Sequence, residues 1–327
     1  MAVPVVDLAQ GTAATQAAVL DAALREHGFF AVVNHGVDAA VVAAAFGAGH
    51  HFFALDEAVK RRWHIDGWEE RAPKTPQAAS APQGGVQALG RPGGLLKRGF
   101  DPVGWQALDP TQPPDIKESF YLGVEAIGPN QWPDEALLPG FRAAMEAYSA
   151  ACDALARRLM ALFERALALP AGHFDGFMRH PTCTTRLLHY PPQPAVVAPG
   201  QIGCGAHTDW GALTLLAQDD AGGLQVQSLG GDWVDVAPIP GAFVVNIGDL
   251  MARWTHDRWR STLHRVVNRA AGRERFSIAY FFDLDAEAVI TPLPGCVPAG
   301  EVPRYGPITA GEHLVEMYRR TTVGATA

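Results

Sequence analysis

The sequence predicts a mainly β protein: a double-stranded β-helix, or jelly roll, with helices on its flanks. Two observations favour this fold. After Pro181 the chain becomes a series of short β-prone segments, and Gly, Pro, Asp or Asn stands at most of the junctions between them. Many short strands at such regular spacing are typical of a closed sandwich or barrel. The helical patterns lie before this region and after it.

The first quarter of the chain alternates two β-prone runs with two helical patterns. In order, they are a strand at 3–8, a helix at 15–26, a strand at 29–34 and a helix from 38 towards 55. Gly28 is placed to end the first helix, and Asp38 is placed to cap the second. Residues 72–95 are rich in Pro, Gly, Ala, Ser and Gln, which predicts a loop, either a functional lid or a disordered segment.

The rest of the chain divides into a long helix, the β region and a last helix. The first helical pattern runs from 134 to 169 with a break at Pro139-Gly140, and its apolar stripe predicts that it faces the core. Strands are expected within seven segments: 184–191, 202–218, 222–228, 233–238, 242–248, 261–267 and 275–283. A last amphipathic helix is expected at 310–320. One compact unit is therefore predicted, with an N-terminal region at 1–125, a long-helix region at 126–180, a jelly-roll core at 181–290 and a C-terminal extension at 291–327.

Composition and charge argue against several classes of protein. The 327 residues are 48% hydrophobic and 18% charged, as in ordinary globular proteins. A net charge of -8 argues against a nucleic-acid partner, and the basic run Lys60-Arg61-Arg62 is interpreted as a solvated helix end. The N-terminus lacks a basic n-region, and no stretch approaches the roughly 18 apolar residues of a membrane span. We therefore expect a cytoplasmic enzyme without membrane contact, whose four cysteines are reduced.

Three His-x-Asp tripeptides are candidates for part of a metal site. His64-Ile-Asp66 follows a helix end and His173-Phe-Asp175 begins a short helix, where side chains at i and i+2 point about 200° apart, so both are interpreted as structural. His207-Thr-Asp209 lies in a β-prone stretch, where a period of two places both side chains on one face. Its small neighbours are expected to leave room for an ion and its ligands; they are Gly203, Gly205, Ala206 and Gly211.

A third metal ligand should come from another strand. His264 is the best candidate because it lies on an alternating segment after Asp209. His256, in a turn-like polar stretch, and His189, beside a Pro-Pro turn, are weaker candidates. Two histidines and one carboxylate suit non-haem iron(II), because they leave three adjacent positions for a cosubstrate and O2. Zinc is disfavoured, since the helical HExxH motif is absent.

Several motifs together resemble the isopenicillin N synthase-like family of iron(II)/2-oxoglutarate-dependent dioxygenases, over nearly the whole chain. The similar segments, in the family's order, are VPVVDL, GFFAVVNHGV, KESFYLG, RLLHYPP, GAHTDWGALTLLAQD with GLQV, NIGDLMARWTHDRWRSTLHRVVN and RFSIAYFF. The resemblance implies a jelly-roll core with helices at both ends. It also implies oxidation of a small organic molecule by hydroxylation, desaturation or ring formation, with O2 consumed and 2-oxoglutarate converted to succinate and CO2.

The resemblance assigns roles to particular residues. It implies that His207, Asp209 and His264 bind iron(II). It also implies that Arg275 and Ser277 bind the remote carboxylate of 2-oxoglutarate, with Tyr190 adding its hydroxyl. A guanidinium and a hydroxyl on one face of a strand form a strong receptor for a buried carboxylate. Other nearby residues receive no chemical role: Asn246, Gly248 and Asp249 are interpreted as a turn between strands, and Cys204 as a small buried residue near the metal.

Three alternative functions stay open. One is an oxidative cyclase that does not use 2-oxoglutarate, in which Arg275 and Ser277 bind the substrate's own carboxylate. Another is a non-catalytic, metal-containing barrel that only binds a small ligand, and the third is a zinc hydrolase. The sequence identifies neither the small-molecule substrate nor the oligomeric state.

Overall fold

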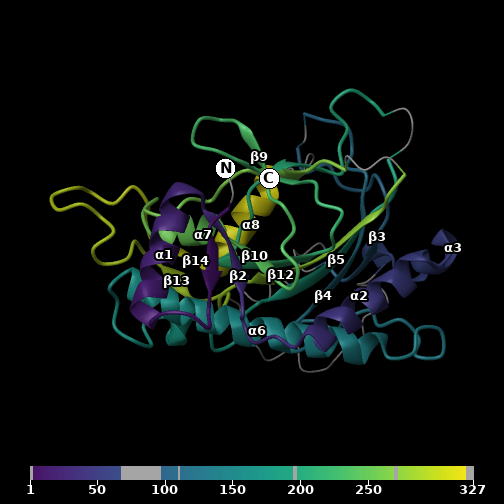
Figure 1. The fold of residues 1–327 in the computed structure, drawn as a ribbon, viewed down its shortest axis with the longest axis horizontal. Coiled ribbons are helices and arrows are strands. Elements are labelled where there is room, and N and C mark those ends of the chain that lie inside the picture. Colours follow the sequence, from purple (N-terminus) through teal and green to yellow (C-terminus); the bar gives the residue numbers. More distant parts are fainter. Residues whose placement is uncertain (1–2, 68–96, 110, 194–196, 269–271, 322–327) are drawn as a thin grey trace.

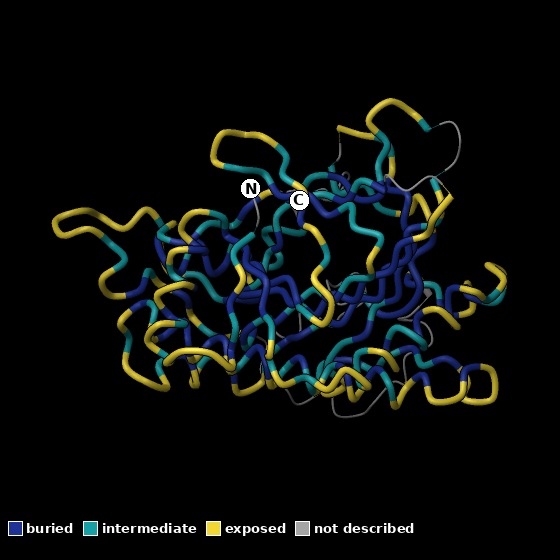
Figure 2. The backbone as a smooth tube through the Cα atoms, in the orientation of Figure 1, coloured by how far each residue is buried: buried dark blue, intermediate teal, exposed yellow. Residues whose placement is uncertain are grey.

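The fold is a sandwich of two β-sheets with a layer of helices on one side (Figure 1). The computed structural model describes residues 3–67, 97–109, 111–193, 197–268 and 272–321. The loop predicted at 72–95 lies outside these residues. Buried backbone is concentrated in the strands between the helices and the upper loops, and exposed backbone lies in the loops around the edge (Figure 2). The predicted jelly-roll core with flanking helices is confirmed.

The larger sheet has eight strands, in the order β1-β2-β10-β7-β12-β5-β4-β3. Their bounds, in chain order, are β1 Val5–Asp7, β2 Phe29–Val33, β3 Gly99–Asp101, β4 Glu118–Gly123, β5 Thr184–Tyr190, β7 Leu213–Gln218, β10 Phe243–Ile247 and β12 Arg275–Phe282. All neighbours are antiparallel except β1 and β2. Six of these strands lie within segments where strands were expected, whereas β3 and β4 were not predicted.

The smaller sheet has four strands, in the order β6-β11-β8-β9. Their bounds are β6 Cys204–His207, β8 Leu224–Gln227, β9 Trp233–Asp235 and β11 His264–Val266, and a separate pair joins β13 Val289–Ile290 to β14 Ile308–Thr309. A buried apolar cluster joins the inner faces of the two sheets, with Leu188 and Ala279 from the larger sheet and Val226 and Val266 from the smaller. This inner space is where side chains from both sheets meet.

A helical layer covers the outer face of the larger sheet (Figure 1). The helices, in chain order, are α1 Ala13–Glu26, α2 Ala39–Phe53, α3 Glu57–Lys60, α6 Phe141–Ala166, α7 Asp249–Trp254 and α8 Ala310–Thr321, of which α1, α2 and α6 form this layer. The predicted cap is confirmed, because Asp38 Oδ1 accepts a hydrogen bond from Ala40 N at 2.8 Å. The predicted break before the long helix is also confirmed: α6 begins directly after Gly140, whose φ is +76°.

The basic run after α2 is not a solvated helix end throughout. Arg61 and Arg62 are exposed, but Lys60 is buried, and its Nζ lies 2.7 Å from Glu118 Oε2 on β4. The ammonium also donates a hydrogen bond to Phe53 O at 3.2 Å. The interpretation of Lys60 as solvated is therefore wrong, because a carboxylate 58 residues away supplies the partner that a buried charge needs.

The described residues also bear on membrane contact and on the state of the cysteines. No single helix there is long and apolar enough to cross a membrane; α2 together with Glu57–Trp63 meets the criteria of length and composition only as a pair bent by 109°. All four cysteines are free, and three of them are buried.

Candidate metal centre

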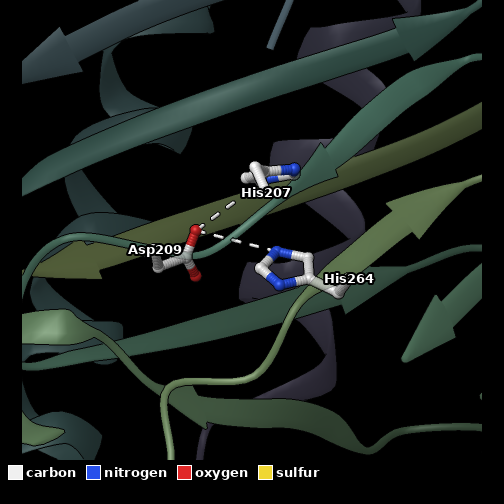
Figure 3. A group of neighbouring side chains, drawn as sticks. All are labelled: His207, Asp209 and His264. Carbon is white, nitrogen blue, oxygen red and sulfur yellow. Dashed lines mark ion pairs between the residues drawn. The ribbon is translucent and has the colours of Figure 1, made fainter. Parts of the chain in front are cut away.

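Three side chains converge where the two sheets meet (Figure 3). His207 is the last residue of β6, His264 is the first residue of β11, and the strand register pairs them directly. Asp209 lies two residues after His207, in the connection from the smaller sheet to β7 of the larger. Asp209 Oδ1 is 4.0 Å from His207 Nε2 and 3.7 Å from His264 Nε2. One ligand atom from each residue lies within 4.8 Å of the other two, a spacing that one metal ion can bridge.

Backbone carbonyls hold both imidazole rings in orientation. His207 Nδ1 is 2.8 Å from Gly205 O, and His264 Nδ1 is 3.1 Å from Thr262 O. A carbonyl oxygen only accepts, so Nδ1 carries the proton in each ring and Nε2 keeps its lone pair. The free Nε2 atoms are the ones that face Asp209. This is the arrangement by which hydrogen-bonded partners orient metal-binding histidines.

The carboxylate is oriented in the same way. Asp209 Oδ2 accepts hydrogen bonds from Thr214 Oγ1 at 2.5 Å and from Asn246 Nδ2 at 2.7 Å. These bonds fix the side chain and leave Oδ1 towards the histidines. Asp209, Thr214 and Asn246 are all buried, so few water molecules compete for these hydrogen bonds.

The predicted turn at 246–249 is wrong. Asn246 lies in the middle of the register between β10 and its neighbours, and Asp249 begins the six-residue helix α7. Asp249 Oδ2 accepts a hydrogen bond from Thr208 Oγ1 at 2.9 Å, and Asp249 N donates one to Asp209 O at 2.8 Å. Asn246 and Asp249 thus support the segment that carries His207 and Asp209, and the sequence analysis missed this role.

Burial and charge give the three side chains the ionisation states that bind a metal. Burial, together with His207, lowers the pKa of His264 to about 4 against the opposing effect of Asp209. Burial also lowers the pKa of His207. Burial alone would raise the pKa of Asp209, but His264, His207 and the two hydrogen-bond donors outweigh it and hold the pKa below the ordinary value. Neutral imidazoles beside a carboxylate match the ligand set of iron(II).

Two of the small residues around the site, Gly203 and Gly205, do not serve the predicted purpose. A Cβ at Gly203 would lie 2.9 Å from the Tyr190 ring, and one at Gly205 would lie 2.9 Å from Asp109 N. A Cβ at Gly211 would lie 1.6 Å from Asp283 Oδ1. The expectation that these glycines leave room for an ion is therefore wrong for Gly203 and Gly205, since the space beside each is filled by another part of the protein, whereas Gly211 lines the cavity beside His207 and Asp209.

The other candidate histidines lie apart from the metal centre. Of the described residues, only His207, Asp209 and His264 form a group of three potential metal ligands. His189 is a buried core histidine between two carboxylates, with Nδ1 2.7 Å from Glu118 Oε1. His256 Nε2 accepts a hydrogen bond from Arg304 N at 3.1 Å. The tripeptides at 64–66 and 173–175 lie in 3-10 turns or next to them.

The residues predicted to bind a carboxylate lie together on the inner face of the larger sheet. Arg275 and Ser277 alternate on β12, and Arg275 Nη1 is 3.0 Å from Ser277 Oγ. Tyr190 lies opposite Arg275 in the register of β5 and β12, with the guanidinium 4.8 Å from the centre of its ring. Arg275 is 1% exposed, and no carboxylate of the described residues pairs with it. A buried guanidinium without a carboxylate partner is suited to bind an anionic ligand.

A cavity of about 190 Å³ adjoins the metal centre between the sheets. His207 and Asp209 lie in its wall, together with four aromatic residues: Tyr121 of β4, Phe281 of β12, Tyr318 of α8, and Trp210. Charged side chains also line it, namely Lys97, Arg186 and Asp283. Most of the wall is apolar, so the cavity can hold a small organic molecule beside the metal ligands.

Comparisons with known proteins agree with this geometry. The family model of the 2OG-Fe(II) oxygenase superfamily matches residues 181–284, and the model of the non-haem dioxygenase N-terminal region in morphine synthesis matches residues 3–135. The 2-oxoglutarate-Fe(II) type oxidoreductase hxnY of Emericella nidulans is 34% identical over 313 residues, which cover 90% of this chain and 81% of hxnY. The chain belongs to the iron(II)/2-oxoglutarate-dependent oxygenase family.

Further relatives support the enzyme class. Homoarginine-6-hydroxylase 2-ODD-C23.1 of Arabidopsis thaliana is 35% identical to this oxygenase over 309 residues, covering 90% of this chain and 86% of the hydroxylase. The crystal structure of a full-length Neurospora crassa protein in complex with alpha-KG and thymine superposes with a TM-score of 0.81 at 30% identity, covering 98% of this oxygenase and 97% of the Neurospora protein. The predicted class, a non-haem iron(II)/2-oxoglutarate-dependent dioxygenase, is therefore confirmed.

Proposed function

We propose that His207 Nε2, Asp209 Oδ1 and His264 Nε2 bind iron(II), and that this oxygenase hydroxylates a small molecule in the adjoining cavity. The observation that carries the proposal is the convergence of these three atoms, each on a side chain whose other polar atom is already hydrogen bonded. When bound, iron(II) with 2-oxoglutarate supplies O2 activation, so that one oxygen atom enters the substrate C–H bond and the other enters succinate. The protein residues orient the ligands and bind the organic molecules.

The proposed binding site for 2-oxoglutarate is formed by Arg275, Ser277 and Tyr190. The buried guanidinium of Arg275 supplies its two remaining N–H donors to the remote carboxylate, and the hydroxyls of Ser277 and Tyr190 supply one donor each. The Arg275 side chain is already fixed, because its Nε donates to Gly222 O at 2.7 Å and its Nη2 to Gln218 Oε1 at 3.3 Å. Little side-chain entropy is therefore lost when a carboxylate binds.

The cavity and the relatives support a small substrate. A volume of about 190 Å³ is below that of a site for a drug-sized ligand. The Arabidopsis relative is named a homoarginine hydroxylase, and the Neurospora protein was crystallised with thymine. Both compounds are small and contain nitrogen. The name of the Arabidopsis relative favours hydroxylation over desaturation or ring formation for this chain as well.

The test measures conversion of 2-oxoglutarate to succinate and CO2 with added iron(II). The native protein should form succinate slowly without a substrate, while His264→Ala and Arg275→Leu should lose at least about 90% of this activity. His256→Ala is the matched control, since its ring lies outside the metal centre, and it should keep the native rate. Consumption of O2 by native protein without 2-oxoglutarate would instead favour the oxidative cyclase.

Three expectations from the sequence stay predictions. These are a cytoplasmic location, the absence of a nucleic-acid partner and the absence of membrane contact. Their support is the net charge of -8 and the composition of the sequence.

A further inference from the structure

Asp283 places a carboxylate in the cavity without a partner among the residues that the structure describes. It directly follows β12 and continues the alternating row of Arg275, Ser277 and Phe281. Its side chain lines the cavity that also contains His207 and Asp209. Over the described ranges, no backbone or side-chain group donates a hydrogen bond to this carboxylate, and no cation pairs with it. A carboxylate in such surroundings normally has donors or a cation.

The backbone beside Asp283 is shaped to accommodate its carboxylate. A Cβ at Gly211 would lie only 1.6 Å from Asp283 Oδ1 and 2.8 Å from its Cγ. Gly211 has no positive φ, so the close approach of the carboxylate, and not an unusual backbone conformation, requires glycine here. Gly211 is two residues after Asp209, so this contact places the Asp283 carboxylate next to the metal-binding segment.

The two cations in the cavity wall interact with other groups. Arg186 Nη2 donates to Gln106 Oε1 at 2.8 Å and to Ser119 Oγ at 2.9 Å, and it lies 3.4 Å from Asp101 Oδ2. The Lys97 ammonium lies over the ring of Tyr318, 5.7 Å from its centre. Neither cation neutralises Asp283. Consistent with this, burial and, to a smaller extent, the charge of Asp209 together raise the pKa of Asp283 to about 7.

We propose that Asp283 determines substrate specificity by binding a protonated nitrogen, an ammonium or guanidinium, of a small molecule whose apolar part contacts Tyr121, Trp210 and Phe281. This inference rests on the proposed function, because it assigns a substrate class to the same cavity. A cation would supply the hydrogen-bond donors and the positive charge that the carboxylate lacks. The three aromatic residues would contact the hydrocarbon portion and also favour a cation near their faces. The substrate would thus be a small organic base.

The experiment compares matched pairs of small molecules that differ in charge. The pairs are L-homoarginine with L-homocitrulline, whose ureido group replaces the guanidinium, and phenethylamine with 2-phenylethanol. Their dissociation constants are measured by calorimetry on the full chain with 2-oxoglutarate present, for the native protein, Asp283→Asn and Glu287→Gln. Glu287 is an exposed carboxylate four residues away, so it controls for a general change in net charge.

The native protein and Glu287→Gln should bind the cationic member of at least one pair roughly 10- to 100-fold more tightly than the neutral member. In Asp283→Asn this preference should fall to about 1. The proposal is overturned if no pair shows a preference for the cation, or if the preference persists in Asp283→Asn.

A second readout separates this proposal from the proposed function. Native protein and the exposed control Glu287→Gln should both convert 2-oxoglutarate slowly without substrate. If this conversion occurs but cations are not preferred, only the role of Asp283 is wrong. If native protein neither binds nor converts 2-oxoglutarate, both proposals are overturned.

Discussion

Replacing Asp283 by Asn should stabilise the metal-free protein at neutral and alkaline pH, although the residue lines the candidate active site. Burial, together with a smaller contribution from Asp209, raises the pKa of the Asp283 carboxyl from 3.8 to about 7. Asn keeps the shape of the carboxyl group but does not ionise. The substitution therefore removes the free energy that is required to ionise this carboxyl inside the folded protein.

The sign of the effect follows from the proton equilibria of the folded and unfolded states. Below about pH 4 the carboxyl is protonated in both states, so Asp283 has no such cost. Between about pH 4 and pH 7 the unfolded chain loses the proton while the folded protein keeps it, and the free energy of unfolding falls as pH rises. Above about pH 7 the cost is constant. The difference between the two pKa values, at about 1.4 kcal/mol per pH unit, gives a cost of about 4 kcal/mol. This value is an upper limit, because solvent in the cavity screens the charge.

Urea denaturation of the metal-free protein at about pH 5 and about pH 8 measures this cost. Asp283→Asn should exceed the native protein in free energy of unfolding by roughly 1–4 kcal/mol at the higher pH, and by less than half as much at the lower pH. The exposed control Glu287→Gln should differ from native by less than about 0.5 kcal/mol at both. A variant that is less stable than native at about pH 8, or a gain that does not depend on pH, would refute the reasoning.

Three further predictions concern the residues around the metal centre. Asn246→Ala removes the 2.7 Å hydrogen bond to Asp209 Oδ2, so iron(II) affinity should fall roughly 10- to 100-fold in a chelator competition assay, and an unchanged affinity would contradict this role. Arg275→Leu should raise the dissociation constant of 2-oxoglutarate at least about 10-fold while iron(II) binding without cosubstrate is unchanged. Gly211→Ala should lower the melting temperature, because its Cβ would overlap Asp283 Oδ1, and Gly211→Ala combined with Asp283→Ala should recover part of the loss.

Local sequence patterns were sufficient to predict a structural feature where a single segment of the chain determines that feature. Asp38 caps α2 because its side chain reaches the backbone two residues later, and Gly140 marks the start of α6 because its positive φ suits glycine. The metal ligands could be selected for a related reason. In a β-prone segment, side chains two residues apart point to the same side, so His207 and Asp209 could be selected over the His-x-Asp tripeptides in helical segments. The alternating pattern of β11 identified His264 as the third candidate.

Contacts between distant segments could not be read in this way. Lys60 was interpreted as solvated because its partner Glu118 lies on a strand that was not predicted. Asn246 received no role because its bond to Asp209 depends on the position of β10 relative to the turn after β6. A polar amide within the apolar segment AFVVNIG was the available signal, since a buried amide needs a partner. The short helix α7 was missed because six residues give little periodicity to detect.

The central claim is that His264 and Arg275 belong to one site for iron(II) and 2-oxoglutarate. The most direct measurement is anaerobic visible absorbance while iron(II) and 2-oxoglutarate are added to native protein, Arg275→Leu and His264→Ala. Native protein should develop a charge-transfer band, which Arg275→Leu weakens at low 2-oxoglutarate concentration and His264→Ala abolishes. The absence of a band in native protein that has bound iron(II) would contradict the assignment of 2-oxoglutarate to this site.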